Sequence, residues 1–219
     1  MDFALYLIVL PILLMSVVVH EVAHALVAKW EGDDTAHRLG RITLNPIPHL
    51  DPVGSIVVPL ILIALPGDFI FGWARPVPVN PRNYRDYVRG DIRVSLAGIV
   101  SNFLLAIGFT LLLAFVQWLG ARTGFGMVLL VLSDAAYFGI FINLILAIFN
   151  LLPIPPLDGS HVVYHLLPGN LRNRYRELGR YGIGVIMLLV LVVPNGFSLL
   201  LRPVTFLADL ALAFAALWV

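Results

Sequence analysis

Long apolar runs, separated by short polar stretches, dominate the chain. A membrane-spanning helix needs about 20 mostly apolar residues to cross roughly 30 Å of hydrocarbon. Four runs reach that length, at residues 3–30, 92–119, 127–152 and 181–201. A shorter run at residues 203–219 predicts a further helix that is tilted, partial or interfacial. The pattern therefore predicts an all-α protein that crosses a membrane several times.

A further stretch, at residues 53–73, is long enough to span but is interrupted. Pro59 lies within it, and Pro66-Gly67-Asp68 is typical of a turn. The distribution of arginine helps to orient this stretch, because short loops rich in arginine stay on the cytoplasmic side. Two predicted spans separate two arginine clusters, so both clusters can be cytoplasmic. The clusters are formed by Arg75, Arg82, Arg85, Arg89 and Arg93, and by Arg172, Arg174, Arg176 and Arg180.

The loop after the first span carries Lys29, Arg38 and Arg41, and we expect it on the same side. Residues 53–73 must then enter and leave the membrane by one face. This predicts a re-entrant or broken helical hairpin there, with a plain span as the alternative. The number of transmembrane helices is accordingly about five to six.

Composition supports a membrane protein and excludes several other classes. Of the 219 residues, 60% are hydrophobic and 12% are charged, and the mean hydropathy is +0.94. An ordinary soluble domain carries about 25% charged residues. The formal charge of +1 gives no long-range field for acidic partners, so a nucleic-acid binder is excluded. The absence of cysteine excludes disulfides, thiolate metal sites and thiol nucleophiles.

Residues 20–24 of the first apolar run read HEVAH, an HExxH motif. His20 and His24 share one helix face, so both imidazoles can reach one metal ion. Glu21 is offset by about 100° of helix rotation, which suits it to a zinc-bound water that it would activate as a general base. Ionisable residues inside a span cost about 2.5 kcal/mol or more each and mark function. Counted back from Lys29, the pair lies about 8–14 Å below the cytoplasmic end of the helix.

Two histidines leave a catalytic zinc one protein ligand short, because such sites use three ligands and a water. The candidates for the third ligand are Asp134, Asp158, His161 and His165. Asp158 is the best of these, since it follows a proline-rich stretch at the end of a span. Unwound backbone at membrane depth is tolerated where it is buried in protein or lines a wet cavity. Asp158 with His161 and His165 forms a rival metal-binding set.

In these two motifs, HEVAH and the proline-rich stretch before Asp158, the sequence resembles the site-2 proteases, zinc metalloproteases that cut within membranes. The resemblance rests on HEVAH together with NLLPIPPLDG, and it continues through GRITLNPIPHLDPVGS and GWARPVPVNPRNYR. These motifs look like a compact bacterial and archaeal subgroup without PDZ or CBS domains. The resemblance implies one transmembrane metalloprotease domain over residues 1–219. Its catalytic core would cover about residues 1–168, and additional C-terminal helices about residues 181–219.

Carried over by motif, His20, His24 and Asp158 would bind one zinc ion per chain and Glu21 would be the catalytic base. Asn150 would contact substrate near the site. The substrates would be transmembrane proteins of a prokaryotic cell membrane, cut at an active site towards the cytoplasmic side. One departure is that family members often read AGPxxN where residues 97–102 read AGIVSN.

The loop at residues 37–44, HRLGRITL, ends in a short β-prone run. The family often has a small membrane-dipping β-hairpin at this place, so we expect a hairpin-like loop here. A substrate helix must unwind before hydrolysis and can then add as a strand to an exposed edge. Arg41, Ile42 and Thr43 are therefore candidate substrate-binding residues. In the nearby PHLDPVG, His49 and Asp51 are expected to stabilise a turn, with gating or a metal-linked role as the alternative.

Two other functions compete with an intramembrane endopeptidase. A membrane transporter or metal-binding protein could use the same His/Asp site, but it would gain nothing from Glu21, and transporters often show paired inverted halves that this chain lacks. A catalytically silent relative would bind transmembrane segments without cutting them, and the intact Glu21 argues against it.

Overall fold

The computed structural model describes residues 3–58, 60–61, 74–182, 184 and 196–217. Four long helices make up most of this part: α1 (Phe3–Glu31), α4 (Tyr87–Thr123), α5 (Met127–Leu151) and α9 (Gly196–Ala216). The shorter elements are α2 (Thr35–Arg38), η1 (Ile47–His49), η2 (Pro52–Val57), η3 (Pro81–Asn83), α6 (Gly159–Leu166), α7 (Gly169–Glu177) and η4 (Leu178–Arg180). The described ranges contain no strand.

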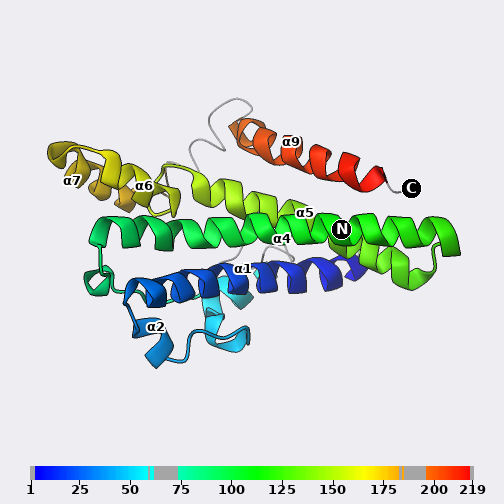
Figure 1. Ribbon diagram of the computed structural model, residues 1–219, viewed down its shortest axis with the longest axis horizontal. Helices are drawn as coiled ribbons and strands as arrows, with labels where there is room; N and C mark the ends of the chain where they lie inside the picture. The colour runs from blue at the N-terminus through cyan, green and yellow to red at the C-terminus, as the bar shows by residue number, and fades with distance from the viewer. Residues whose placement is uncertain (1–2, 59, 62–73, 183, 185–195, 218–219) are drawn as a thin grey trace.

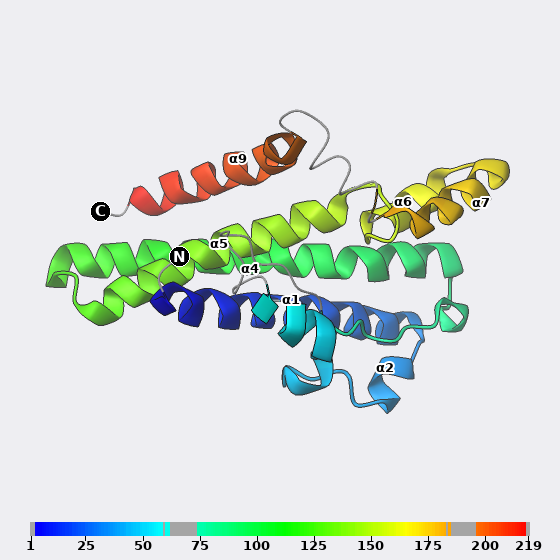
Figure 2. The same cartoon turned by 180° about the vertical axis from the view of Figure 1, so that it is seen from behind.

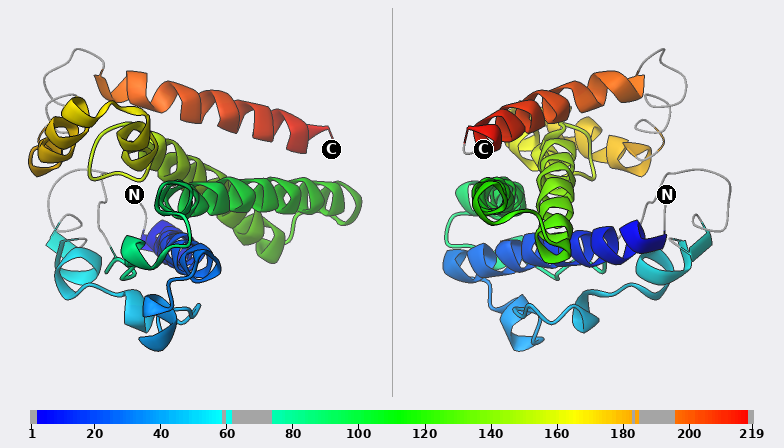
Figure 3. Two further views of the ribbon diagram at one scale, coloured as in Figure 1. Left: turned by 60° about the vertical axis from the view of Figure 1, so that its left-hand side comes forward. Right: turned by 90° about the vertical axis from the view of Figure 1, so that its right-hand side faces the viewer.

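The long helices pack in layers, with α4 and α5 in the middle. Helix α1 runs beside α4 and also contacts α5 (Figure 1). The view from behind shows α2 and the turns that follow it on the outer side of α1 (Figure 2). Helix α9 covers α4 and α5 on the side away from α1 (Figure 3). Helices α4 and α5 therefore lie between α1 and α9 and contact both.

Four described helices are long and apolar enough to cross a membrane, at Leu5–Glu31, Tyr87–Thr123, Met127–Leu151 and Ser198–Ala216. The first three confirm the spans predicted from the apolar runs. Helix α4 extends beyond its predicted span at both ends, and at its start the Asp86 carboxylate caps it by accepting from the Val88 and Arg89 N–H groups. This is an all-α membrane protein, although the predicted count of five to six transmembrane helices is not confirmed.

The C-terminal boundary differs from the prediction. The sequence suggested separate helices at residues 181–201 and 203–219, whereas α9 is one helix that continues through Pro203. Transmembrane helices tolerate proline when side chains or neighbours satisfy the freed backbone groups. Most of residues 181–195 lie outside the described residues, as does most of the predicted re-entrant stretch at 53–73.

Small side chains form the contact between α4, α5 and α9. The alanines in this cluster are Ala106, Ala114, Ala136, Ala208 and Ala215, each at most 7% exposed. Between them pack larger buried side chains, those of Leu113, Ile140, Leu144 and Val204. In a membrane, helix association depends on close packing rather than on the exclusion of water, so small residues at the contact are expected.

The loop at residues 37–44 is not a β-hairpin in the described structure. Residues 41–43 run without a strand partner, and side chains hold them instead. The buried Arg41 donates from Nη2 to the backbone oxygens of Arg75 and Pro76, at 2.8 and 3.3 Å. His49 bonds to the carbonyl of Thr43 at 3.0 Å. The predicted hairpin is therefore not confirmed.

A buried carboxylate just beyond α1 anchors the segment that leads into α4. Asp33 is fully buried and accepts from the Thr35 hydroxyl and backbone N–H, from the Asn80 N–H at 2.6 Å and from the Asn83 amide at 2.8 Å. Burial opposes its ionisation, but these hydrogen bonds outweigh that effect and hold the pKa of Asp33 below its ordinary value. Asp33 therefore fixes residues 80–83 against the end of α1.

We expect Asp33→Asn to destabilise the protein by about 2 kcal/mol at neutral pH, because one oxygen that accepts hydrogen bonds becomes a donor. A carboxyl whose pKa is lower in the folded state contributes stability above its unfolded pKa and loses it as pH falls. Thermal unfolding in detergent should therefore show a difference that shrinks towards about pH 3. The matched control is Asp34→Asn, since the half-exposed Asp34 has only a 3.8 Å ion pair with Arg38. Equal stability of the two variants would contradict this role.

Candidate metal centre

Helix α1 presents two imidazoles on one face, one turn apart. The His20 and His24 rings meet edge to face, with their centroids 4.6 Å apart. Their Nε2 atoms lie 3.0 Å from each other. His20 is 7% exposed, so the pair faces the interior of the bundle as the HExxH spacing predicted.

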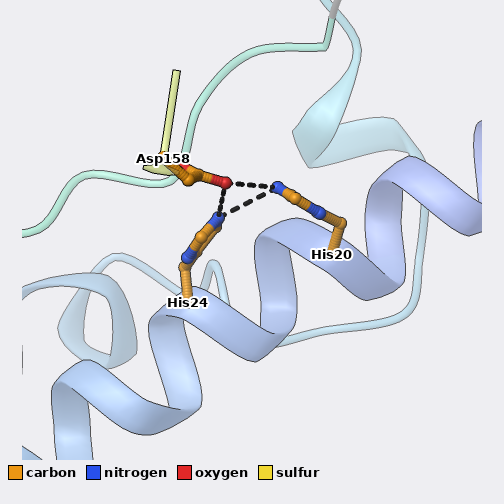
Figure 4. Close-up of side chains that lie close together, drawn as sticks. All are labelled: His20, His24 and Asp158. Carbon is orange, nitrogen blue, oxygen red and sulfur yellow. Dashed lines mark hydrogen bonds and ion pairs between the residues drawn. The ribbon is translucent and has the colours of Figure 1, made fainter. Parts of the chain in front are cut away.

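Asp158 reaches the same point from a distant part of the chain. Its Oδ2 atom lies 3.1 Å from His20 Nε2 and 3.3 Å from His24 Nε2 (Figure 4). Asp158 precedes α6, after the proline-rich turn that ends α5. Gly159 has to be glycine here, because a Cβ atom would overlap the carbonyl of Leu151 at the end of α5.

Oxygen acceptors fix the outer nitrogen of each imidazole. His24 Nδ1 lies 2.6 Å from the carbonyl oxygen of Val94 on α4, which can only accept. His20 Nδ1 lies 2.5 Å from Asn102 Oδ1. Both imidazoles therefore carry their proton on Nδ1 and direct an Nε2 lone pair towards Asp158, the tautomer that metal-ligating histidines adopt.

A chain of buried amides sets the orientation of Asn102. Its Nδ2 donates to Asn143 Oδ1 at 2.9 Å. Asn143 in turn donates from Nδ2 to Ser16 Oγ and to the carbonyl of Gly139, both at 2.9 Å. Because a carbonyl can only accept, the direction of every amide in the chain is defined. The network joins α1, α4 and α5, and Asn102 and Asn143 are both fully buried.

Gly98 on α4 leaves the space that the imidazoles occupy. A Cβ atom at this position would lie 2.5 Å from both His20 Nε2 and His24 Nε2. Gly98 therefore accommodates the two rings directly and lets α4 approach the face of α1 that carries them.

The carboxylate of Glu21 lies on an adjacent face of α1 and contacts a different segment. Its Oε2 accepts from the Val77 N–H at 2.7 Å. Val77 is buried. The segment around it is held at two places: Asp33 accepts from the Asn80 N–H, and Arg41 donates to the backbone oxygens of Arg75 and Pro76. The orientation of Glu21 therefore depends on loop contacts as well as on α1.

The three converging groups fit a metal cation. With each imidazole protonated on Nδ1, two Nε2 lone pairs and one carboxylate oxygen converge, and these are the donor atoms that zinc takes from histidine and aspartate. Tetrahedral zinc with bonds of about 2.0–2.2 Å separates its ligand atoms by roughly 3.3–3.6 Å. The observed separations of 3.0–3.3 Å need little adjustment. Among the described residues, this is the one group of such side chains with ligand atoms within 4.8 Å of one another.

The rival metal-binding set is wrong. His161 and His165 turn away from Asp158 and contact Asp91 of α4, at 3.0 and 2.7 Å. The remaining candidate ligand, Asp134, is exposed on α5. The separation arises because Asp158 lies before the first turn of α6, where it can point towards α1.

Other residues singled out in the sequence make local contacts. Asn150 donates to the carbonyl of Leu146 within α5. Asp51 caps η2 by accepting from the N–H groups of Val53 and Gly54. His49 is fully buried, and its carbonyl accepts from the Arg75 N–H at 2.8 Å. The contacts of His49 and Asp51 agree with the turn-stabilising role.

Sequence reasoning did not identify Asn143 or Ser16 as partners of the site. Their signal is that both are polar residues within apolar spans, where hydrogen-bonding groups need a partner. The structure also places Asn102, the last residue of AGIVSN, against His20. The contact between Val77 and Glu21 uses a backbone N–H, which no side-chain pattern can reveal.

An HExxH pair with a distant carboxylate, inside an apolar helix bundle, is the side-chain arrangement of a metal-dependent hydrolase. Comparison with known proteins gives the same class. The family model described as "Peptidase family M50" matches residues 125–193. The chain is 44% identical over 190 residues to "Putative zinc metalloprotease YwhC" of Bacillus subtilis, covering 84% of this chain and 80% of that protein.

A protein with the same description, Rip2 of Mycolicibacterium smegmatis, is 31% identical over 180 residues. The match covers 81% of this chain but only 64% of Rip2. An archaeal relative with that description, MJ0611 of Methanocaldococcus jannaschii, is 32% identical over 102 residues, 43% of this chain and 45% of that protein. No solved structure matches the chain.

The chain therefore belongs to peptidase family M50, the site-2 proteases. It is a zinc metalloprotease, with zinc as its cofactor. The resemblance stated from the sequence is thereby confirmed.

We expect Gly98→Ala to weaken zinc binding at least tenfold, roughly the loss seen when the support of a metal ligand is removed, because the added methyl group displaces both imidazoles. Zinc affinity can be measured on the purified protein by competition with a chromophoric chelator. Gly108→Ala on the same helix is the control, since a Cβ atom there has no neighbour within 4 Å. Alanine is also a better helix former than glycine, so the control should be at least as stable as the wild type. Unchanged zinc affinity in Gly98→Ala would contradict the close fit.

Proposed function

We propose that this protein is an intramembrane zinc metalloendopeptidase that hydrolyses peptide bonds of transmembrane protein substrates. His20, His24 and Asp158 hold the zinc ion, and Glu21 is the catalytic base. The observation that carries the proposal is the convergence of the three ligand atoms inside helices that can span a membrane. A soluble metalloprotease has no need to place its site within such helices.

The chemistry divides between the metal and the carboxylate of Glu21. Zinc, when bound, supplies Lewis acidity that polarises the scissile carbonyl and acidifies a water molecule. Glu21 accepts a proton from the attacking water and later delivers it to the leaving nitrogen. Hydrolysis therefore consumes one water, breaks the peptide C–N bond and leaves Glu21 in its starting state. The Val77 N–H at 2.7 Å holds the Glu21 carboxylate in place for both transfers.

The substrate has to unwind before its carbonyl can reach the metal, because a transmembrane helix uses its carbonyls in its own hydrogen bonds. Arg41, Ile42 and Thr43 are the proposed docking edge for the unwound segment. Ile42 packs with Ala25, Ala36 and Val77, so this edge adjoins the segment that contacts Glu21. Asn150, at the end of α5, is proposed as a further substrate contact.

We place the protein in a prokaryotic cell membrane with its active site towards the cytoplasmic side. The support is the position of HEVAH near the C-terminal end of α1, together with the arginines that follow in the loops. Arginines near an anionic membrane surface contribute about 1 kcal/mol each to its attraction. This orientation brings the site within reach of a substrate that enters from the bilayer.

The test is cleavage by wild type and Glu21→Gln after reconstitution with candidate single-span substrates. We expect Glu21→Gln to keep its zinc but to cleave at least about 100-fold more slowly, since general acid–base groups contribute about 10²–10⁴-fold. Zinc content by atomic absorption and products by mass spectrometry give the two readouts.

The control is Glu31→Gln. Glu31 is the last residue of the same helix, but its carboxylate forms an ion pair with Arg93 of α4. The control variant should cleave at the wild-type rate. Equal cleavage by Glu21→Gln and wild type would rule out the proposed base. Bound zinc with no cleavage of any substrate would favour a transporter or metal-binding protein.

A further inference from the structure

Helix α6 carries the ligand Asp158 at its start, but it is short and follows a proline-rich turn. It has eight residues, Gly159–Leu166, so its own hydrogen bonds cannot hold it rigidly. Its neighbour in space is the N-terminal part of α4, beside which it lies (Figure 1). Of the helices that α6 contacts, α4 contributes most, so these contacts can determine where Asp158 points.

One carboxylate oxygen makes the polar contacts between α6 and α4. Oδ2 of Asp91 lies 3.0 Å from Nδ1 of His161 and 2.7 Å from Nε2 of His165. Asp91 is on α4 and is 6% exposed. The two histidines are four residues apart on α6, so they share a helix face. Asp158 precedes His161 by three residues, at the N-cap of α6, and points towards α1 instead.

Aromatic packing fixes the second of these histidines. The His165 ring meets Tyr87 of α4 at 5.5 Å and Tyr164 of α6 at 5.0 Å, edge to face in both cases. The side chain of His165 is 1% exposed. Among the described residues its Nδ1 is buried without a hydrogen-bond partner, so Nε2 is the ring nitrogen that contacts the protein, by donating to Asp91.

The other histidine completes the pair at the surface. The side chain of His161 is 46% exposed, and its hydrogen bond to Asp91 outweighs burial and raises the pKa of the His161 imidazole. Both imidazoles donate to one oxygen, so α6 is attached to α4 at two successive turns. Two attachments prevent rotation of a helix, whereas one would leave it free to turn.

We propose that Asp91 is a positioning residue for the metal centre, which anchors α6 to α4 through His161 and His165 and so fixes Asp158 beside the two imidazoles of α1. This inference rests on the proposed assignment of Asp158 as a zinc ligand. Asp91 itself does not touch the metal. It acts through the orientation of α6, as partners behind metal ligands commonly do.

The test is a double-mutant cycle on zinc affinity, using the full-length apoprotein in detergent and competition with a chromophoric chelator. The four proteins are wild type, Asp91→Ala, Asp158→Ala and the double variant. We expect Asp91→Ala to weaken zinc binding about tenfold when Asp158 is present. In the Asp158→Ala background it should change the affinity less than twofold, because there is no longer a ligand to position.

Asp33→Asn is the control, since it also alters a buried carboxylate but one that contacts neither α6 nor the metal ligands. It should lower stability without changing zinc affinity in either background. If Asp91→Ala does not fold, His161→Ala replaces it in the cycle. This change at a half-exposed residue removes one of the two attachments, and a loss of about threefold is expected.

An equal loss in both backgrounds, or no loss with Asp158 present, would overturn the inference and leave the proposed function standing. A wild-type affinity that Asp158→Ala does not change would instead contradict the ligand assignment, and the positioning role with it. The two failures are therefore distinguishable in one set of measurements.

Discussion

Polar groups inside an apolar helix bundle must be satisfied by one another, because hydrocarbon offers no hydrogen bonds. Here that constraint organises the centre of the protein. Each imidazole of the HExxH motif donates a hydrogen bond from Nδ1 to an acceptor on α4, and its Nε2 lone pair is then directed at Asp158. The two lone pairs and the Asp158 carboxylate then form the set of donor atoms that a metal cation takes. The hydrogen bonds from His20 and His24 to α4 thus both hold α1 against α4 and orient the two imidazoles of the proposed metal site.

The same constraint explains why α4 matters as much as α1. It supplies the Val94 carbonyl and Asn102 to the imidazoles, leaves space for them at Gly98, and contacts α6 through Asp91. The HExxH helix supplies the proposed ligands, but the orientation of their rings depends on a helix about 80 residues later in the sequence. Substitutions on α4 should therefore affect the metal site without touching the motif.

Part of this structure could be predicted from the sequence. Apolar runs located α1, α4 and α5 closely, because spans need a minimum length and few charges. The HExxH spacing and the proline-rich turn before Asp158 were sufficient to select the three candidate ligands. These features are local or follow from general constraints on membrane helices.

Other parts could not be predicted, because they depend on tertiary contacts. The loop at 37–44 looked β-prone, but the Arg41 side chain and His49 hold its backbone in place of a partner strand. His161 and His165 have ligand-like spacing after Asp158, but both form hydrogen bonds to the buried Asp91 of α4. Pro203 suggested a helix boundary that packing in α9 does not require. In each case the competing interaction comes from a residue distant in the sequence.

We propose that HEVAH and Asp158 hold a single zinc ion together. X-ray absorption at the zinc edge of the purified protein, compared with Asp158→Ala, tests it most directly. We expect two imidazole nitrogens and additional oxygen ligands at about 2.0–2.2 Å in the wild type. In the variant we expect a changed first coordination shell. An identical spectrum from the two proteins, or a site with no imidazole, would contradict it.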